Sequence, residues 1–218
     1  MVEVIPTIIA KDLNELQEKI KKVESFVDWV QIDVMDGQFV ENTTWNEPSD
    51  LKKIETSLNL EAHLMIKEPE KYIDQWINSG VKRIIFHIEA TDKIKEVIDQ
   101  VKQAGLGVGL AINPETPVET VDQFVDQLDL ILVMTVHPGQ GGQDFLESSL
   151  GKIKQLRAKY KHVKIEVDGG INLETAPEVI QAGANLLASG TAIFKSDDIE
   201  QTVNTLKDYE YQGIKRKS

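Results

Sequence analysis

The chain has 218 residues, of which 36 are acidic and 24 are basic, so its net charge is −12. This balance excludes a broadly basic nucleic-acid binder. No apolar run approaches the ~20 residues that a membrane helix needs. The chain has no cysteine, which excludes disulfides, thiolate metal sites and a cysteine nucleophile. An anionic substrate remains compatible with the acidic composition, because backbone N–H groups can bind an anion locally.

The first residues, 1–4, lack the basic and apolar regions of a secretory signal, and we expect a cytoplasmic protein. Short β-branched runs then alternate with longer amphipathic segments along the chain. Strands are expected at residues 3–9, 29–35, 60–66, 83–88, 107–112, 130–136, 163–168 and 186–189. Helices are expected at residues 13–23, 48–55, 70–78, 93–103, 118–127, 146–160, 173–181 and 199–206.

This alternation implies a parallel sheet, and eight strand–helix units in ~200 residues predict an α/β fold, a single-domain (β/α)₈ TIM barrel spanning residues 1–218. An open doubly wound sheet is the alternative. The glycine fingerprint of dinucleotide-binding sheets is missing after the first strand, where Ile9 is followed by Ala10 and Lys11. A short basic tail, residues 211–218, is expected to fray at the end of the domain.

Polar side chains stand at the strand ends, where the chemistry of such a barrel is located. Side chains alternate along a strand, so Gln31 and Asp33 point into the barrel while their apolar neighbours pack outward. The same alternation directs His63 and Asp168 inward at the ends of the third and seventh strands. Two carboxylates and an imidazole can bind a divalent metal. Alternatively, the aspartates cap loops and His63 is an interior histidine with satisfied hydrogen bonds.

Near the end of the fourth strand, His87 is followed two residues later by Glu89, and the two lie on one face. We expect a polar pair that either stabilises the strand end or borders a pocket. Three glycine-rich segments follow the last three strands, at residues 137–143, 168–170 and 189–191. Glycines let backbone N–H groups approach an anion, and phosphate commonly binds at the late loops of these barrels. Tight turns alone are the other interpretation.

Several strand-end motifs occur in one order along nearly the whole chain. They include residues 32–37 (Ile-Asp-Val-Met-Asp-Gly), 62–65 (Ala-His-Leu-Met), 86–90 (Phe-His-Ile-Glu-Ala), 109–114 (Gly-Leu-Ala-Ile-Asn-Pro), 166–170 (Glu-Val-Asp-Gly-Gly) and 189–193 (Ser-Gly-Thr-Ala-Ile). In this combination the chain resembles ribulose-phosphate 3-epimerases. The 3-epimerases of allulose 6-phosphate share most of these motifs.

The resemblance implies interconversion of D-ribulose 5-phosphate and D-xylulose 5-phosphate, with Asp33 and Asp168 as acid and base on opposite faces of C3. It implies a divalent cation (Zn, Fe, Mn or Co) held by these aspartates, by His63 and by the residue at position 31. It also implies a small phosphorylated sugar as partner, and a homo-oligomer. The residues that it assigns to the substrate and its phosphate are Thr7, His63, Gly139, Gln140, Gly141, Gly142, Gly169, Gly170, Gly190 and Thr191.

Departures from the family pattern gather where the ligand should lie. Gln31 replaces a histidine ligand, and an amide oxygen is a poorer partner than imidazole for zinc, iron or cobalt. Gln140 replaces an apolar residue in the loop over the substrate. These changes leave two alternatives: an enzyme that acts on another ketose phosphate, and a non-catalytic phosphosugar-binding protein with an impaired metal site. Met35, Met65 and Met134 either line the site as an apolar wall or fill the core.

Overall fold

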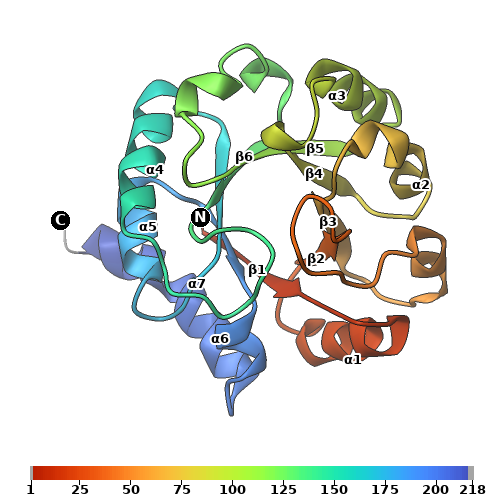
Figure 1. Ribbon diagram of the computed structural model, residues 1–218. Coiled ribbons are helices and arrows are strands. Elements are labelled where there is room, and N and C mark those ends of the chain that lie inside the picture. The colour runs from red at the N-terminus through yellow and green to blue at the C-terminus, as the bar shows by residue number, and fades with distance from the viewer. Residues whose placement is uncertain (1, 216–218) are drawn as a thin grey trace.

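Eight parallel strands pair in chain order and close into a barrel in the computed structural model of this protein (Figure 1). The structure describes residues 2–215. Closure is made by β8 against β1, with Glu3 opposite Leu186 and Pro6 opposite Ser189. The predicted (β/α)₈ fold is confirmed, and the closed ring excludes the open sheet. The strands are β1 (Glu3–Ile8), β2 (Trp29–Met35), β3 (Asn59–Met65), β4 (Arg83–His87), β5 (Gly107–Ile112), β6 (Leu130–Met134), β7 (Lys164–Asp168) and β8 (Leu186–Ser189).

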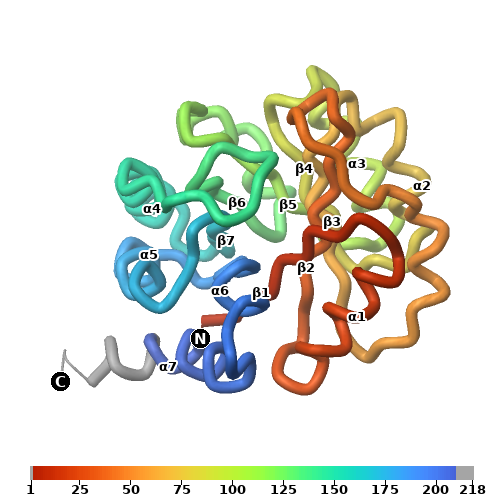
Figure 2. Tube along the Cα trace, turned by 60° about the horizontal axis from the view of Figure 1, so that its bottom comes forward, coloured from red at the N-terminus to blue at the C-terminus, as the bar shows by residue number. Residues whose placement is uncertain are grey.

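The connections between strands run around the outside of the barrel, as the tube in Figure 2 also shows. The α-helices are α1 (Leu13–Val23), α2 (Ile73–Ile77), α3 (Ile94–Gln103), α4 (Ser148–Lys159), α5 (Ala176–Ala182), α6 (Thr191–Phe194) and α7 (Ile199–Lys215). The 3₁₀ helices are η1 (Pro48–Lys53), η2 (Pro69–Lys71), η3 (Ile88–Ala90), η4 (Val118–Val121) and η5 (Val125–Gln127). Within residues 2–215, none of the helices has the length and apolar character needed to cross a bilayer.

The helix predicted at residues 118–127 was wrong, because this connection consists of η4 and η5. Its buried apolar residues are Val118, Val121 and Phe124, and a spacing of three matches the three residues per turn of a 3₁₀ helix. The predicted helix at 173–181 starts later, at Ala176. Its start is delayed because the Asn172 side-chain oxygen accepts backbone hydrogen bonds from residues 174 and 175 and holds a turn there.

Two further differences concern the end of the chain. The short helix α6, directly after β8, was not predicted, since four residues carry no readable periodicity. Helix α7 continues well beyond the predicted 199–206 and reaches Lys215. Residues 211–215 of the predicted tail therefore lie in this helix, and residues 216–218 lie outside the described part of the chain.

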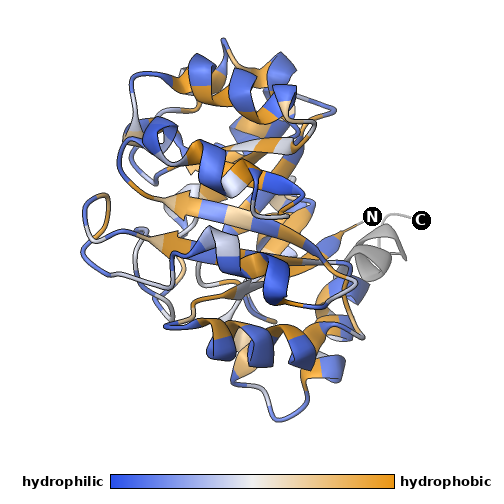
Figure 3. Cartoon of the chain, turned by 90° about the vertical axis from the view of Figure 1, so that its right-hand side faces the viewer, coloured by the Kyte–Doolittle hydropathy of each residue, from blue (hydrophilic) through white to orange (hydrophobic). Residues whose placement is uncertain are grey.

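The outward faces of the strands and the inner faces of the helices form the main core. Apolar and polar residues alternate along the surrounding helices, as the hydropathy colours of Figure 3 show. Helix α1 illustrates how the sequence directs this packing. Asp12 caps its N-terminus by accepting a hydrogen bond from the Glu15 N–H at 2.9 Å. Leu16, Ile20 and Val23 are then buried against the sheet. This packing fixes the strands from outside, so the barrel interior is free to hold polar side chains.

A second, smaller apolar cluster fills part of the barrel interior, and a buried ionic network lies beside it. The Arg83 guanidinium donates from Nε to Glu61 at 2.6 Å and approaches Glu166 at 3.9 Å. Its central carbon lies 4.3 Å from the Trp29 ring centroid. Burial, and then the charge of Glu61, raise the pKa of Glu166 well above its ordinary value. One arginine therefore serves two buried carboxyl groups, and the ionised form of Glu166 is disfavoured.

Candidate active site

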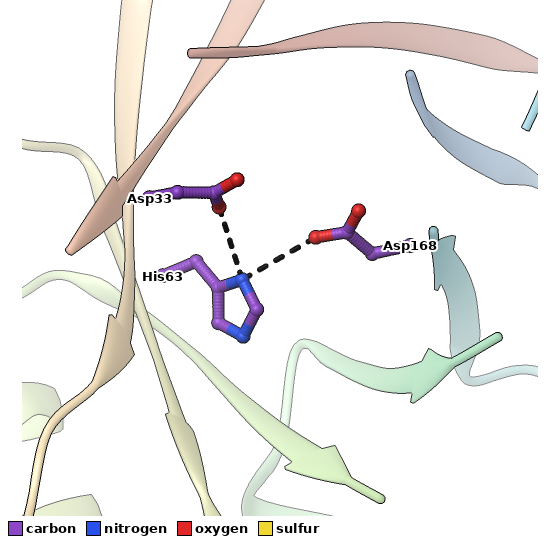
Figure 4. Close-up of side chains that lie close together, drawn as sticks. All are labelled: Asp33, His63 and Asp168. Carbon is purple, nitrogen blue, oxygen red and sulfur yellow. Dashed lines mark hydrogen bonds and ion pairs between the residues drawn. The ribbon is translucent and has the colours of Figure 1, made fainter. Parts of the chain in front are cut away.

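Two carboxylates and one histidine converge at the C-terminal ends of their strands (Figure 4). The β2–β3 register places Asp33 directly beside His63, and β7 contributes Asp168. His63 Nδ1 lies 3.2 Å from Asp33 Oδ1 and 3.3 Å from Asp168 Oδ2. All three residues are buried. The structure therefore brings together three of the four side chains that strand alternation predicted to point inward, and the fourth is Gln31.

Gln31 joins the two carboxylates directly. Its amide nitrogen donates to Asp33 at 2.8 Å and to Asp168 at 2.7 Å. The same nitrogen lies 3.4 Å from His63 Nδ1. The amide oxygen of Gln31 is buried and has no hydrogen-bond partner. Both amide hydrogens thus satisfy the carboxylate pair, and the oxygen is left as an orphaned acceptor.

The metal implied by the family resemblance fits these residues. One ligand-capable atom from each of Asp33, His63 and Asp168 lies within 4.8 Å of the others. Carboxylate oxygen and imidazole nitrogen are ordinary ligands for divalent first-row metals. A half-turn of the Gln31 amide exchanges its nitrogen and oxygen, which would present the orphaned oxygen to a cation between the carboxylates. The donor set is then three oxygens and one nitrogen.

The electrostatics of the group follow from burial and from mutual contacts. Burial, and next the negative charge of Asp168, raise the pKa of Asp33 to about 6, against the opposing effects of His63 and Gln31. Burial works to lower the pKa of His63, but its hydrogen bonds to Asp168 and Asp33 outweigh burial and raise this pKa to about 9. In the absence of a cation, His63 is therefore protonated near neutral pH and offsets the two carboxylates.

His63 also contacts the predicted His87–Glu89 pair. His63 Nε2 lies 2.9 Å from His87 Nε2, and His87 Nδ1 lies 3.4 Å from Glu89 Oε2. Burial lowers the pKa of His87. The two alternatives for the pair were stabilisation and pocket formation. The structure joins the pair to the back of the site, behind His63.

A cavity of about 590 Å³ opens above the aspartates. It is lined by Met35, Met65 and Met134 beside Asp33 and Asp168, so the methionines line the site although each is almost fully buried. Gln31 and His63 are wholly buried and lie outside this lining. The predicted substrate residues that line the cavity are Thr7, Gly139, Gln140, Gly141, Gly142, Gly169, Gly170, Gly190 and Thr191.

Two of these positions illustrate why glycine is needed around the cavity. Gly170 has φ +67°, and a Cβ there would lie 2.8 Å from the backbone nitrogen of Phe145. At Gly190 a Cβ would lie 2.5 Å from the hydroxyl of Thr7. Such close approaches exclude any side chain without movement of the neighbouring loop. The glycines therefore keep the loops after β7 and β8 closely packed around the cavity.

Two cationic residues of the cavity were missed by the sequence analysis. Lys19 on α1 reaches back to donate to the Ile9 carbonyl at 2.7 Å, and Lys195 follows α6. Both line the cavity. In sequence, Lys19 lies on the polar side of an amphipathic helix, and nothing distinguishes it from a solvent-exposed lysine. Only the folded path from β1 into α1 brings its ammonium group to the cavity.

Fold and site together define a TIM-barrel enzyme with paired carboxylates at the C-terminal mouth of the barrel. The profile of the ribulose-phosphate 3 epimerase family matches residues 3–194. The ribulose-phosphate 3-epimerase of Bacillus subtilis is 41% identical over 215 residues, covering 95% of this chain and 99% of the relative. That of Schizosaccharomyces pombe is 40% identical over 211 residues, covering 94% and 92%. The chain therefore belongs to the ribulose-phosphate 3-epimerase family and is an isomerase, as its motifs predicted.

Solved structures of lower identity agree on the fold. A 3-hexulose-6-phosphate synthase superposes with a TM-score of 0.73 at 17% identity, covering 95% of this chain and 99% of that chain. The structure titled KGPDC from Streptococcus mutans has a TM-score of 0.75 at 13% identity, with coverages of 97% and 98%. These similarities support the barrel architecture alone.

Proposed function

We propose that this epimerase interconverts D-ribulose 5-phosphate and D-xylulose 5-phosphate, with Asp33 and Asp168 as the acid–base pair at C3. The observation that carries the proposal is the pair of buried carboxylates, from β2 and β7, which border one cavity and share the contacts of His63 and Gln31. Relatives named ribulose-phosphate 3-epimerase, at 40% and 41% identity, support the same substrates.

Inversion at C3 needs a base on one face of the sugar and an acid on the other. Burial and the neighbouring charge of Asp168 disfavour the ionised form of Asp33, against the opposing effect of His63. The raised pKa of Asp33, about 6, agrees with a pair that readily takes up a proton. One aspartate accepts the C3 proton while its protonated partner donates to the opposite face.

The proton leaves a carbon beside a ketone, so negative charge develops on the neighbouring oxygen. A divalent cation, when bound, supplies positive charge that stabilises this oxygen. Asp33, His63 and Asp168 would hold the cation, together with the turned amide oxygen of Gln31. Three oxygens and one nitrogen suit manganese better than zinc or cobalt, since carboxylate and carbonyl ligands favour harder ions. We therefore propose manganese as the preferred metal among zinc, iron, manganese and cobalt.

The phosphate is proposed to bind among the glycines that line the cavity after β6, β7 and β8. Backbone N–H groups without neighbouring side chains can approach its oxygens closely. Lys195 adds positive charge to the same cavity, and Lys19 lines it with an ammonium group that is paired with Glu15 at 2.8 Å, within a chain whose net charge is −12. This local charge is the reason why a globally acidic protein can still bind an anionic sugar.

A coupled assay with ribulose 5-phosphate tests the proposal, after separate loading of the protein with manganese, iron, zinc and cobalt. Turnover that is fastest with manganese is expected. Turnover only with a different ketose phosphate would overturn the substrate assignment. Binding of phosphosugars without turnover, and without exchange of the C3 proton for deuterium, would favour the non-catalytic alternative.

Two broader expectations accompany this function. We propose a homo-oligomer, which light scattering behind size-exclusion chromatography tests by giving a mass above that of one chain. We propose a cytoplasmic location, which cell fractionation with an antibody to the protein tests. A monomeric mass or a membrane-bound fraction would contradict the respective expectation.

A further inference from the structure

We propose that Glu89 and His87 are positioning residues that determine which ring nitrogen of His63 carries a proton, so that Nδ1 is free to bind a cation. This inference rests on the metal site of the proposed function. It extends that site to two residues that lie outside the cavity lining. It is carried by a line of contacts from the carboxylate pair through both imidazole rings to Glu89.

The two imidazole rings meet edge to edge. Their Nε2 atoms are 2.9 Å apart, their centroids are 5.1 Å apart, and their planes differ by 21°. The centroid separation exceeds the nitrogen separation by roughly one ring width, so nearly coplanar rings face each other through their nitrogens. Only one proton fits between two nitrogens at this distance. One ring therefore donates and the other accepts.

Glu89 determines the polarity of this hydrogen bond. Its Oε1 accepts a hydrogen bond from the Asn113 N–H at 2.9 Å and another from the Thr116 hydroxyl. The other oxygen, Oε2, faces His87 Nδ1 at 3.4 Å, an ion-pair contact rather than a hydrogen bond, and this buried Nδ1 has no hydrogen-bond partner. An ionised carboxylate can only accept hydrogen bonds. If Nδ1 of the buried His87 carried no proton, its lone pair would face the lone pairs of Glu89 Oε2. The proton of His87 therefore resides on Nδ1.

The contacts of each ring then determine where the protons of His87 and His63 lie. His87 is fully buried, and Phe39 packs against its ring at a centroid distance of 4.8 Å. A neutral His87 with its proton on Nδ1 must accept at Nε2. His63 must then donate from Nε2, so the additional proton of the cationic ring occupies Nδ1, and this atom is bare once that proton leaves. That atom lies between Asp33 and Asp168, at 3.2 and 3.3 Å.

This arrangement matches what a metal ligand requires. A metal-binding imidazole normally donates its second N–H to an outer partner, and that contact fixes the tautomer and the ring orientation. Here the outer partner is a second histidine, itself oriented by a carboxylate. When a cation displaces the proton on His63 Nδ1, the Nε2 proton and both outer contacts stay unchanged. The site therefore needs no rearrangement behind His63 to accept its metal.

Glu89→Gln is a near-isosteric test, because it reverses the polarity of the line of contacts. The new amide oxygen can keep the Asn113 and Thr116 hydrogen bonds, which places the NH₂ group toward His87 Nδ1. His87 then accepts at Nδ1 and donates from Nε2. His63 is left with its proton on Nδ1, the atom that must be bare. A matched control is Glu115→Gln, since Glu115 also lies 3.4 Å from a histidine Nδ1, that of His137, but on the surface.

Nitrogen NMR of the metal-free, histidine-labelled protein gives the direct readout, with the four histidines assigned by single substitutions. The wild type should show a neutral His87 protonated on Nδ1, and Glu89→Gln should move this proton to Nε2. Competition against a chelator should show manganese bound ~10- to 100-fold more weakly by Glu89→Gln. Glu115→Gln should match the wild type in both measurements.

A wild-type His87 protonated on Nε2 would overturn the inference. So would a Glu89→Gln variant whose manganese affinity equals that of the wild type. Both measurements are independent of turnover. If the wild type fails to epimerise ribulose 5-phosphate but shows the expected tautomer and the Glu89-dependent affinity, the proposed function fails and the inference stands. If the wild type epimerises ribulose 5-phosphate but its His87 is protonated on Nε2, the proposed function stands and the inference fails.

Discussion

Replacing Gln31 with leucine removes the amide that joins the two catalytic candidates while keeping a side chain of similar size. In the metal-free protein, Gln31 Nε2 donates to Asp33 at 2.8 Å and to Asp168 at 2.7 Å. Leucine offers no donor, so both carboxylates lose a hydrogen bond inside the barrel. We expect Gln31→Leu to lower the free energy of unfolding of the metal-free protein.

The size of the effect follows from the contacts. A hydrogen bond to a charged group contributes about 1.5–3 kcal/mol, so two such bonds give a loss of about 3–6 kcal/mol. The substitution also removes the Gln31 oxygen, which is buried without a partner, and this relief returns about 1–3 kcal/mol. His63 remains in contact with both carboxylates and limits the loss. The expected net destabilisation is about 2 kcal/mol.

Denaturant titration of chelator-treated protein at pH 7 measures this difference. Gln100→Leu is a matched control, because the oxygen of Gln100 is also buried without a partner but lies on α3, away from the site. The control should not be destabilised. If Gln31→Leu were as stable as the wild type, the amide would not hold the carboxylate pair, and our account of the metal-free site would be refuted.

Three further predictions concern the same site. Asp33→Asn should lower the epimerisation rate ~10²- to 10⁴-fold, because one of the two proton-transfer groups is lost, while phosphosugar binding persists. Steady-state kinetics measures the rate and calorimetry measures the binding, and an active variant would contradict the prediction. In metal-free protein the folded-state pKa of His63, about 9, lies above its ordinary value of 6.5. Protonated His63 therefore stabilises the folded protein fully below pH 6.5, and this contribution is lost as the pH rises through 9. Denaturant titrations should show a loss of up to about 3 kcal/mol, and His63→Asn should not show it. Gln31→His should tighten zinc or cobalt binding in chelator competition, since imidazole replaces an amide oxygen, and an unchanged affinity would refute this ligand preference.

Much of the barrel could be predicted because its strands carry local signals. The β2 segment places Val30, Ile32 and Val34 on one face, and this alternation also directs Gln31 and Asp33 inward. Barrel closure was inferred from the number of strand–helix units rather than from any residue. The 118–127 connection was misassigned because a run of apolar residues three apart fits both a 3₁₀ helix and the face of an α-helix.

The candidate site could be predicted only residue by residue. Strand ends identified Asp33, His63 and Asp168, but no local pattern says that side chains from three separate strands meet within 4.8 Å. The contact between His63 and His87 depends on the register of β3 and β4, which sequence alone does not reveal. The same holds for the buried network of Arg83 with Glu61, because each residue alone resembles an ordinary surface charge.

The orientation of the Gln31 amide was also beyond the sequence. From sequence, Gln31 is a substituted metal ligand with an oxygen to offer. In the structure its nitrogen, rather than its oxygen, faces the carboxylates. The reason is electrostatic, because two carboxylates without a cation between them attract N–H donors and repel a carbonyl oxygen. The folded site therefore reveals a state of the residue that composition and spacing could not.

The central claim is that Asp33 and Asp168 move the C3 proton of ribulose 5-phosphate. It is tested most directly by running the reaction with manganese-loaded protein in D₂O and following C3 by NMR and mass spectrometry. Wild-type protein should form xylulose 5-phosphate carrying one solvent deuterium at C3, and Asp33→Asn and Asp168→Asn should not. Xylulose 5-phosphate formed without solvent deuterium, or full activity in either variant, would contradict it.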